Sequence, residues 1–108
     1  MKLKLGTVVL ASTGAIVPTG SITDLYWELT GEVVCRAAGT AGGVMPEARF
    51  LFQKDASTRE GILWGGVNTG TVVVNTTAAQ AVDMTAQWGT GITGNSISAA
   101  TVAIEALN

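Results

Sequence analysis

The fold is decided most clearly by residues 82–88, which read Val82-Asp-Met-Thr-Ala-Gln-Trp88. Apolar and polar side chains alternate along this stretch, with Val82, Met84, Ala86 and Trp88 on one parity. Successive side chains of a β-strand point to opposite faces of the sheet, so this period of two residues is typical of a half-buried strand. The stretch therefore predicts a strand with one face on a hydrophobic core.

The same alternation recurs nearer the N-terminus. Residues 24–36 carry apolar side chains on the parity of Trp27, and residues 47–54 place Phe50 and Phe52 on one parity. Residues 47–54 also contain helix-favouring types such as Glu, Ala and Lys. The shortness of the run and its pair of phenylalanines favour a strand over a short helix. Further strands are expected over 3–12, 62–64, 70–76, 81–88 and 96–107.

Turn signals separate these segments at intervals of about ten residues, which is the pattern of a sandwich or a small barrel. Helical patterns do not alternate with the strands, so a parallel sheet is disfavoured. The chain has 108 residues, the length of one ordinary domain. We therefore predict one domain over residues 1–108, an all-β antiparallel β-sandwich of about eight strands.

The parity of the apolar residues also predicts the core. The side chains expected in it are Trp27, Leu29, Val33, Phe50, Phe52, Val82, Met84 and Trp88. Cys35 shares the apolar parity of its strand, so we expect a buried, inert thiol. Gly31, in the middle of that strand, is a candidate for a bulge.

The composition predicts a partner surface. Charged residues make up 13% of the chain and hydrophobic residues 47%, whereas an average protein has about 25% charged residues. Several apolar residues lie on the parity opposite the expected core, namely Val34, Leu51 and Val73. Several such residues on an outer face imply a partner. We expect the chain to associate with copies of itself, as a homotrimer.

Charge and hydropathy exclude two classes of partner. The net charge is −2, and the six basic residues are scattered among acidic ones, so we expect no binding to nucleic acid. A helix that spans a bilayer needs about 18 to 20 apolar residues, and no apolar run in this sequence approaches that length. We therefore expect no membrane partner. Residues 1–15 have lysines followed by an apolar stretch, as in a weak signal peptide, but their alternation suits a first strand better.

The residue types argue against catalysis. The chain has no histidine and one cysteine, so it lacks the commonest general base and the commonest transition-metal ligand. Residues 89–94 match the pattern G-x-G-x-x-G, but a strand pattern follows them where a dinucleotide site needs a helix. Lys54 and Ser57 leave a Ser–Lys pair formally open. We predict no enzyme, no catalytic residue, no metal site and no cofactor.

Three stretches carry a resemblance to a known class of domain. They are Leu5-Gly-Thr-Val-Val9, Leu29-Thr-Gly-Glu-Val33, and the segment from Asp83-Met-Thr-Ala-Gln-Trp-Gly-Thr90 onward. Together they resemble the small jelly-roll-like domains of tailed-bacteriophage structural proteins. The resemblance implies a jelly-roll-like sandwich, a homotrimer, and a place in the virion after synthesis in the bacterial host cytoplasm. It brings no catalytic or binding residues with it.

The function expected from this resemblance is head decoration, in which the protein binds the lattice of the major capsid protein, or another virion protein, and stabilises it. The alternatives are a receptor-binding tip of a tail fibre or baseplate, and a small carbohydrate-binding module that stacks sugars on an exposed tryptophan. Loops 39–46 and 55–61 and a mobile N-terminal segment 1–4 are the expected contact elements. The candidate partner contacts are Lys2, Lys4, Arg59 and Trp64.

Overall fold

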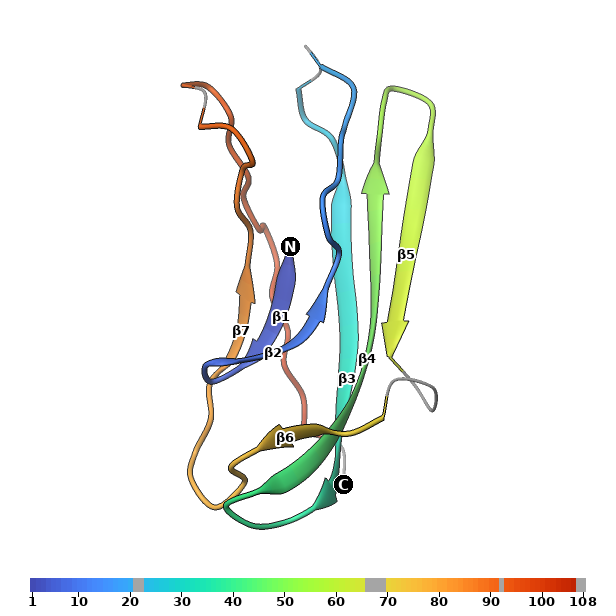
Figure 1. Ribbon diagram of the computed structural model, residues 1–108. Helices are drawn as coiled ribbons and strands as arrows, with labels where there is room; N and C mark the ends of the chain where they lie inside the picture. The colour runs from blue at the N-terminus through green and yellow to red at the C-terminus, as the bar shows by residue number, and fades with distance from the viewer. Residues whose placement is uncertain (21–22, 66–69, 92, 107–108) are drawn as a thin grey trace.

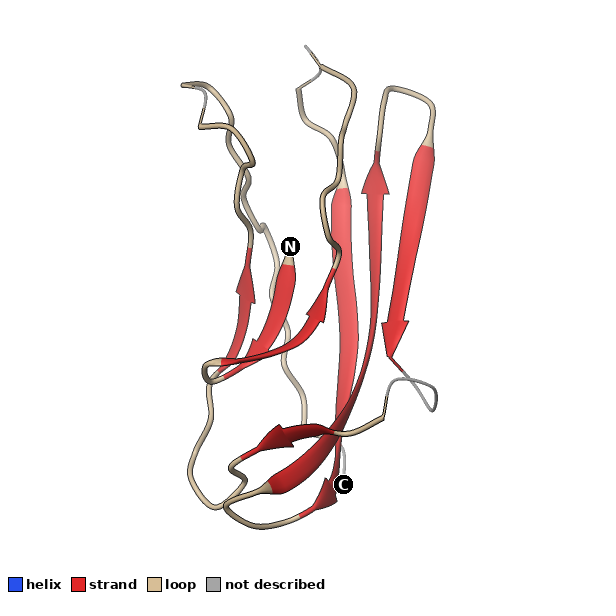
Figure 2. Cartoon of the chain, in the orientation of Figure 1, coloured by secondary structure: helices blue, strands red, loops and turns tan. Residues whose placement is uncertain are grey.

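The computed structural model describes residues 1–20, 23–65, 70–91 and 93–106, and the side chains of Trp64 and Gly65 lie outside that description. All secondary structure in these ranges is β, in seven strands without a helix (Figure 2). The strands are β1 (Lys2–Leu5), β2 (Val8–Ser12), β3 (Trp27–Ala37), β4 (Gly42–Gln53), β5 (Arg59–Gly65), β6 (Val72–Val74) and β7 (Val82–Thr85). The predicted all-β fold is confirmed, including a strand over residues 47–53 rather than a helix.

The strands form two antiparallel sheets, which Figure 1 shows facing each other. One sheet has three strands in the order β2-β1-β7, and the other has four, with β3, β4 and β5 side by side and β6 paired to β4. Strand β4 organises the second sheet, because Glu47–Gln53 pair with β5 while Gly42–Val44 pair with β6. This arrangement is consistent with the predicted sandwich, and the jelly-roll connectivity stays a prediction.

The core follows the alternation of β4. Its even positions, among them Val44, Ala48, Phe50 and Phe52, are buried. The rings of Phe50 and Phe52 stack with centroids 5.4 Å apart, and Trp27 lies 6.4 Å from Phe50. A second group lies at the other end of the sheet, where Leu10, Val44 and Val74 pack together. The sandwich is thus held by two small apolar groups along one strand face.

The predicted core is right in part. Phe50 and Phe52 are buried, and Trp27, Leu29, Val33 and Met84 are half-buried. Val82 and Trp88 are wrong, since they are 44% and 41% exposed. Strand β7 is the edge of its sheet and pairs only with β1 among the described residues, and Trp88 lies beyond its last residue, so neither side chain is covered.

The prediction of a buried Cys35 is also wrong, because this residue is exposed. Cys35 lies on the edge strand β3, directly before a register shift between Cys35 and Ala37. Its thiol donates to the carbonyl oxygen of Ala37 at 3.6 Å. The bulge expected at Gly31 is absent, since the register runs unbroken there, opposite Ala48. The strand needs the small residue for another reason: a Cβ on Gly31 would lie 3.1 Å from Leu3 Cδ2 of the facing sheet.

Several predicted boundaries change. The expected strand over 3–12 is a hairpin, because Gly6 adopts a φ of +58° and turns the chain between β1 and β2. Much of the turn expected over 39–46 is strand, since β4 begins at Gly42. The strand expected over 96–107 is not formed, because residues 96–106 have no ladder partner among the described residues.

Gly42 is a test of close packing at the start of β4. A Cβ there would lie 2.7 Å from the Ala37 carbonyl oxygen and 2.7 Å from Thr76 Oγ1. We expect Gly42→Ala to lower the free energy of unfolding by about 1–3 kcal/mol, because backbone must shift to admit the methyl group. Gly43→Ala is the matched control, since a Cβ there would lie 3.4 Å from Thr71 Cβ. Urea denaturation of both variants measures the effect, and equal stabilities would contradict the packing described.

Candidate interaction surface

The outer face of the four-stranded sheet, defined by the odd positions of β4 and their neighbours, exposes several apolar side chains. Leu63 of β5 and Val73 of β6 are 75% and 65% exposed on this face. Leu51 is half-buried and lies over Gly61, whose Cβ would be 3.9 Å from Leu51 Cδ1. Val34, half-buried, is opposite Met45. The sequence prediction that Val34, Leu51 and Val73 point away from the core is confirmed.

One end of the outer face is polar. The Tyr26 hydroxyl donates to Glu28 Oε2 at 2.7 Å, and Arg49 pairs with Glu28 Oε1 at 3.4 Å. The hydrogen bond from Tyr26 lowers the pKa of Glu28, with Arg49 acting in the same direction, and the same bond raises the pKa of Tyr26. The guanidinium of Arg59 lies 5.6 Å from the centroid of the Tyr26 ring. These side chains satisfy one another, so this end of the face presents a fixed arrangement of charges.

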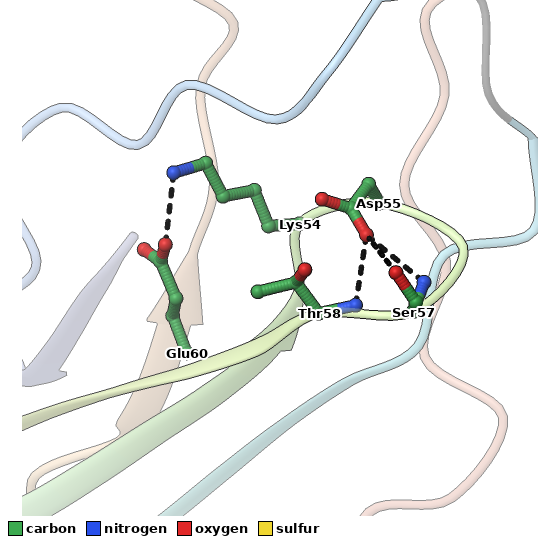
Figure 3. A network of polar contacts seen from close by, with 5 residues as sticks. All are labelled: Lys54, Asp55, Ser57, Thr58 and Glu60. Carbon is green, nitrogen blue, oxygen red and sulfur yellow. Dashed lines mark hydrogen bonds and ion pairs between the residues drawn. The ribbon is translucent and has the colours of Figure 1, made fainter.

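The hairpin tip between β4 and β5 is held by a second polar network (Figure 3). The Asp55 carboxylate accepts hydrogen bonds from the backbone amides of Ser57 at 2.9 Å and Thr58 at 2.8 Å, and from the Ser57 hydroxyl at 3.1 Å. Lys54 pairs with Glu60 at 2.9 Å. An Asp that accepts from the residues after it forms a local turn motif, which orders the tip.

These contacts also answer the question of a Ser–Lys pair. The amine of Lys54 binds Glu60 and the hydroxyl of Ser57 binds Asp55, so the two groups are not hydrogen-bonded to each other. The bond to Glu60 raises the pKa of Lys54, whereas a Lys that acts as a base needs a lowered one. The arrangement at the tip is structural.

Asp55 gives the tip a dependence on pH. Hydrogen bonds from the Ser57 backbone and from Thr58 lower the pKa of Asp55 from its ordinary value of 3.8. The unfolded chain therefore takes up the proton first on acidification, so the stabilisation is complete well above pH 3.8 and is lost as pH falls through the lower folded-state pKa. We expect Asp55→Asn to be less stable than the native chain at pH 7 and to match it in strong acid. Urea denaturation from pH 2 to pH 7, about five units that span the ordinary pKa of Asp, measures the difference in the free energy of unfolding between the two chains. A difference that widens on acidification would contradict this expectation.

The predicted partner contacts lie far apart in the fold. Lys2 and Lys4 belong to β1, the central strand of the three-stranded sheet, so the expectation of a mobile segment 1–4 is wrong. Lys2 is exposed and Lys4 is half-buried. Arg59 is exposed and is the first residue of β5. Trp64 also belongs to β5, where it pairs with Ala48 of β4, and its side chain lies outside the described part. Lys2 and Lys4 share β1, and Arg59 and Trp64 share β5, so the four residues form two pairs on different sheets.

Sequence reasoning missed two features of this surface. Leu63 was not singled out, although its parity, opposite that of Ile62 in the same strand, places it on the outer face. The ordered tip was expected as a loop, although Asp55 followed by Ser57 and Thr58 is a recognisable turn sequence. Both signals are local and were available in the sequence.

The molecule exposes more surface than a compact monomer of its mass. Its accessible surface is 7627 Å², whereas folded monomers of this mass expose about 5600 Å². Its radius of gyration is 15.5 Å, against about 13 Å for a compact domain of this length. The excess of about 2000 Å² is surface that a partner can cover.

Among the described residues, no three His, Cys, Asp or Glu side chains gather in a way that could hold a metal ion. That same part of the chain holds no helix able to cross a bilayer. No helix follows the glycine-rich stretch 89–94 in the described residues. Comparisons with protein families, with curated proteins and with solved structures find no match to this chain.

Proposed function

We propose that the protein is a homotrimeric head decoration protein of a tailed bacteriophage, which binds the lattice of the major capsid protein on the virion and stabilises it. The observation that carries the proposal is the excess of exposed surface together with the apolar outer face. The resemblance of residues 5–9, 29–33 and 83–90 to small jelly-roll-like phage domains supplies the link to the virion.

The areas support assembly. A stable interface buries about 800 Å² on each partner. A subunit of a cyclic trimer meets two neighbours, so it contributes about 1600 Å², which is within the excess of about 2000 Å² that this chain exposes. In the proposed trimer the outer face, with Leu63 and Val73, turns toward the neighbouring subunits. The ordered tip at 55–58 remains free to meet the capsid.

A static role suits the residue types of the chain. Without histidine, the chain would need another base to activate a nucleophile or a water molecule. The tip and the polar end of the outer face hold their charged groups in hydrogen bonds, which favours fixed recognition over proton transfer. A protein that binds only the assembled lattice stabilises it by mass action, without turnover of a substrate.

Deletion of the gene tests the proposal. We expect particles that lack the protein to lose resistance to heat and to chelators while they still adsorb to cells. Expression of the gene from a plasmid is the control and should restore resistance. Particles with unchanged resistance that fail to adsorb would contradict capsid decoration and favour a receptor-binding tip on a tail fibre or baseplate.

The oligomeric state is a separate part of the proposal. We expect light scattering at micromolar concentration to give three times the 11.0 kDa of one chain. A mass near 11.0 kDa would contradict the trimer. Binding of that monomer to immobilised glycans would favour the alternative of a carbohydrate-binding module.

A further inference from the structure

The segment after β7 lies outside both sheets. Residues 93–106 are exposed throughout and have no helix or strand assignment (Figure 2). Among the described residues, none of their backbone groups makes a hydrogen bond to the rest of the chain. Figure 1 shows the segment as a long course, coloured orange to red, that passes along the molecule toward the label C. After the turn at Thr93 and Gly94, residues 95–106 thus make no main-chain hydrogen bond to another described residue.

The composition of this segment is nevertheless that of a strand. Residues 101–106 read Thr-Val-Ala-Ile-Glu-Ala, with three β-branched residues, one charge, and neither Gly nor Pro. Val102 and Ile104 are separated by two positions, so in an extended chain they point to the same side. Both are 67% exposed. The sequence therefore favours strand pairing, for which the described part of the single chain provides no partner.

The segment is seated at one point in its own subunit. Ile97, which is 43% exposed, shares a cleft between the sheets with Trp27 and Met84. Residues 100–106 continue from this point and span about 23 Å when extended. That length lets Val102 and Ile104 reach a neighbouring subunit while Ile97 stays in place.

We infer that residues 101–106 of one copy add as a further strand to the free edge of β5 in a second copy. This inference rests on the homotrimer of the proposed function and names the contact that builds it. Strand addition satisfies exposed peptide groups on both partners and gives affinity through main-chain hydrogen bonds. It also places Val102 and Ile104 beside Leu63, where they extend the apolar outer face.

The choice of β5 follows from a comparison of the sheet edges. Strand β5 pairs only with β4 among the described residues, and its second half, residues 61–65, has no charged side chain. Strand β3 carries Glu28, Glu32 and Arg36, and β7 carries Asp83, and charges of this kind protect an edge against pairing. Strand β2 lies against β4 and β5 of its own subunit. Strand β6 pairs only with β4 among the described residues and is uncharged, but it has three residues, too few to match a six-residue segment. Of the longer edges, the edge of β5 is thus the least protected.

The contact joins two different surfaces, the segment of one copy and the β5 edge of another. Such a contact closes into a ring when the rotation between subunits allows it. The number of three subunits comes from the proposed function. Each subunit then gives one strand and receives one.

Cross-linking between differently tagged chains tests the contact. In a Cys35→Ser background, which removes the exposed native thiol, one chain carries Val102→Cys or Ile104→Cys and the other carries Leu63→Cys. We expect a disulfide between the two tags after mixing and mild oxidation. Thr30→Cys, on the outer face of β3, is the matched acceptor control and should not react. Cross-links to the Thr30→Cys chain, cross-links only between chains with the same tag, or none at all would overturn the inference.

A charge substitution gives an independent measurement. We expect the double variant Val102→Lys/Ile104→Lys to raise the dissociation constant of the trimer at least about 100-fold, because it buries two cations at the new edge. Val17→Lys is the control, since Val17 is 78% exposed in a loop. Far-ultraviolet circular dichroism checks that each variant is folded. A variant that stays trimeric like the control overturns the strand addition.

Hydrogen exchange of the unmodified protein covers the case in which the variants do not fold. The amides of residues 101–106 and of β5 should lose protection together when the trimer is diluted to monomer, and fast exchange of 101–106 in the trimer would overturn the inference. A native trimer with unprotected 101–106 leaves the proposed function standing. If the native protein has a mass of 11.0 kDa at micromolar concentration, both the proposed homotrimer and the strand addition are wrong.

Discussion

Replacing Phe50 by alanine is expected to lower the free energy of unfolding by about 3–5 kcal/mol. Phe50 is 3% exposed and stacks on Phe52, with ring centroids 5.4 Å apart. The ring of Trp27, on the neighbouring strand β3, lies 6.4 Å from the ring of Phe50. The substitution removes the centre of one of the two apolar groups that hold the sheets together, and both a transfer term and a cavity term contribute to the loss.

The loss is large relative to the whole. Small domains have a total stability of about 5–15 kcal/mol, and only seven hydrophobic residues of the described chain are buried. A loss of this size lowers the Tm of a mesophilic domain toward about 37 °C. We therefore expect Phe50→Ala to be partly unfolded at that temperature. Urea denaturation monitored by tryptophan fluorescence measures the change. Val17→Ala, at a position 78% exposed, is the control, and a change for Phe50→Ala as small as for that control would contradict the core described.

Replacing Val73 by glutamate is expected to dissociate the proposed trimer. Val73 is 65% exposed on the outer face, opposite Gly43, so the monomer accepts the carboxylate without strain. In a trimer that covers this face, the same carboxylate loses its water, which costs several kcal/mol for an unpaired ion. Light scattering should then give a mass near the 11.0 kDa of one chain.

Val17→Glu provides the control for this experiment, because it adds the same charge at a position 78% exposed and away from the sheets. The monomeric variant should keep the urea midpoint of a folded domain. If Val73→Glu remains a trimer, the outer face is not the subunit interface, although the strand addition through β5 would still be tested by its own cross-links.

The sequence by itself determined which side chains share a face. Parity placed Phe50 and Phe52 on the inner face and Leu51 on the outer face, and the structure confirms each of them. These predictions succeed because the alternation of side chains is a local property of an extended backbone.

The candidate site was predicted less well. Of the four candidate contacts, Arg59 and Trp64 share β5, whereas Lys2 and Lys4 share β1, the central strand of the other sheet. Leu63 was missed. Position in the chain does not reveal whether a terminal segment is a strand between two others, because that depends on pairing with β2 and β7.

Only the tertiary structure decided which of these faces are covered. Val82 and Trp88 have the parity of a core face, yet they are exposed, because β7 is the edge strand of its sheet and Trp88 lies beyond the last residue of that strand. Cys35 is exposed at the margin of β3 for a similar reason. Residues 101–106 have the composition of a strand but no ladder partner among the described residues of their chain. Alternation is set by bonds between neighbours in the sequence, whereas burial and pairing require a second element at the right place, and its position depends on contacts distant in the sequence.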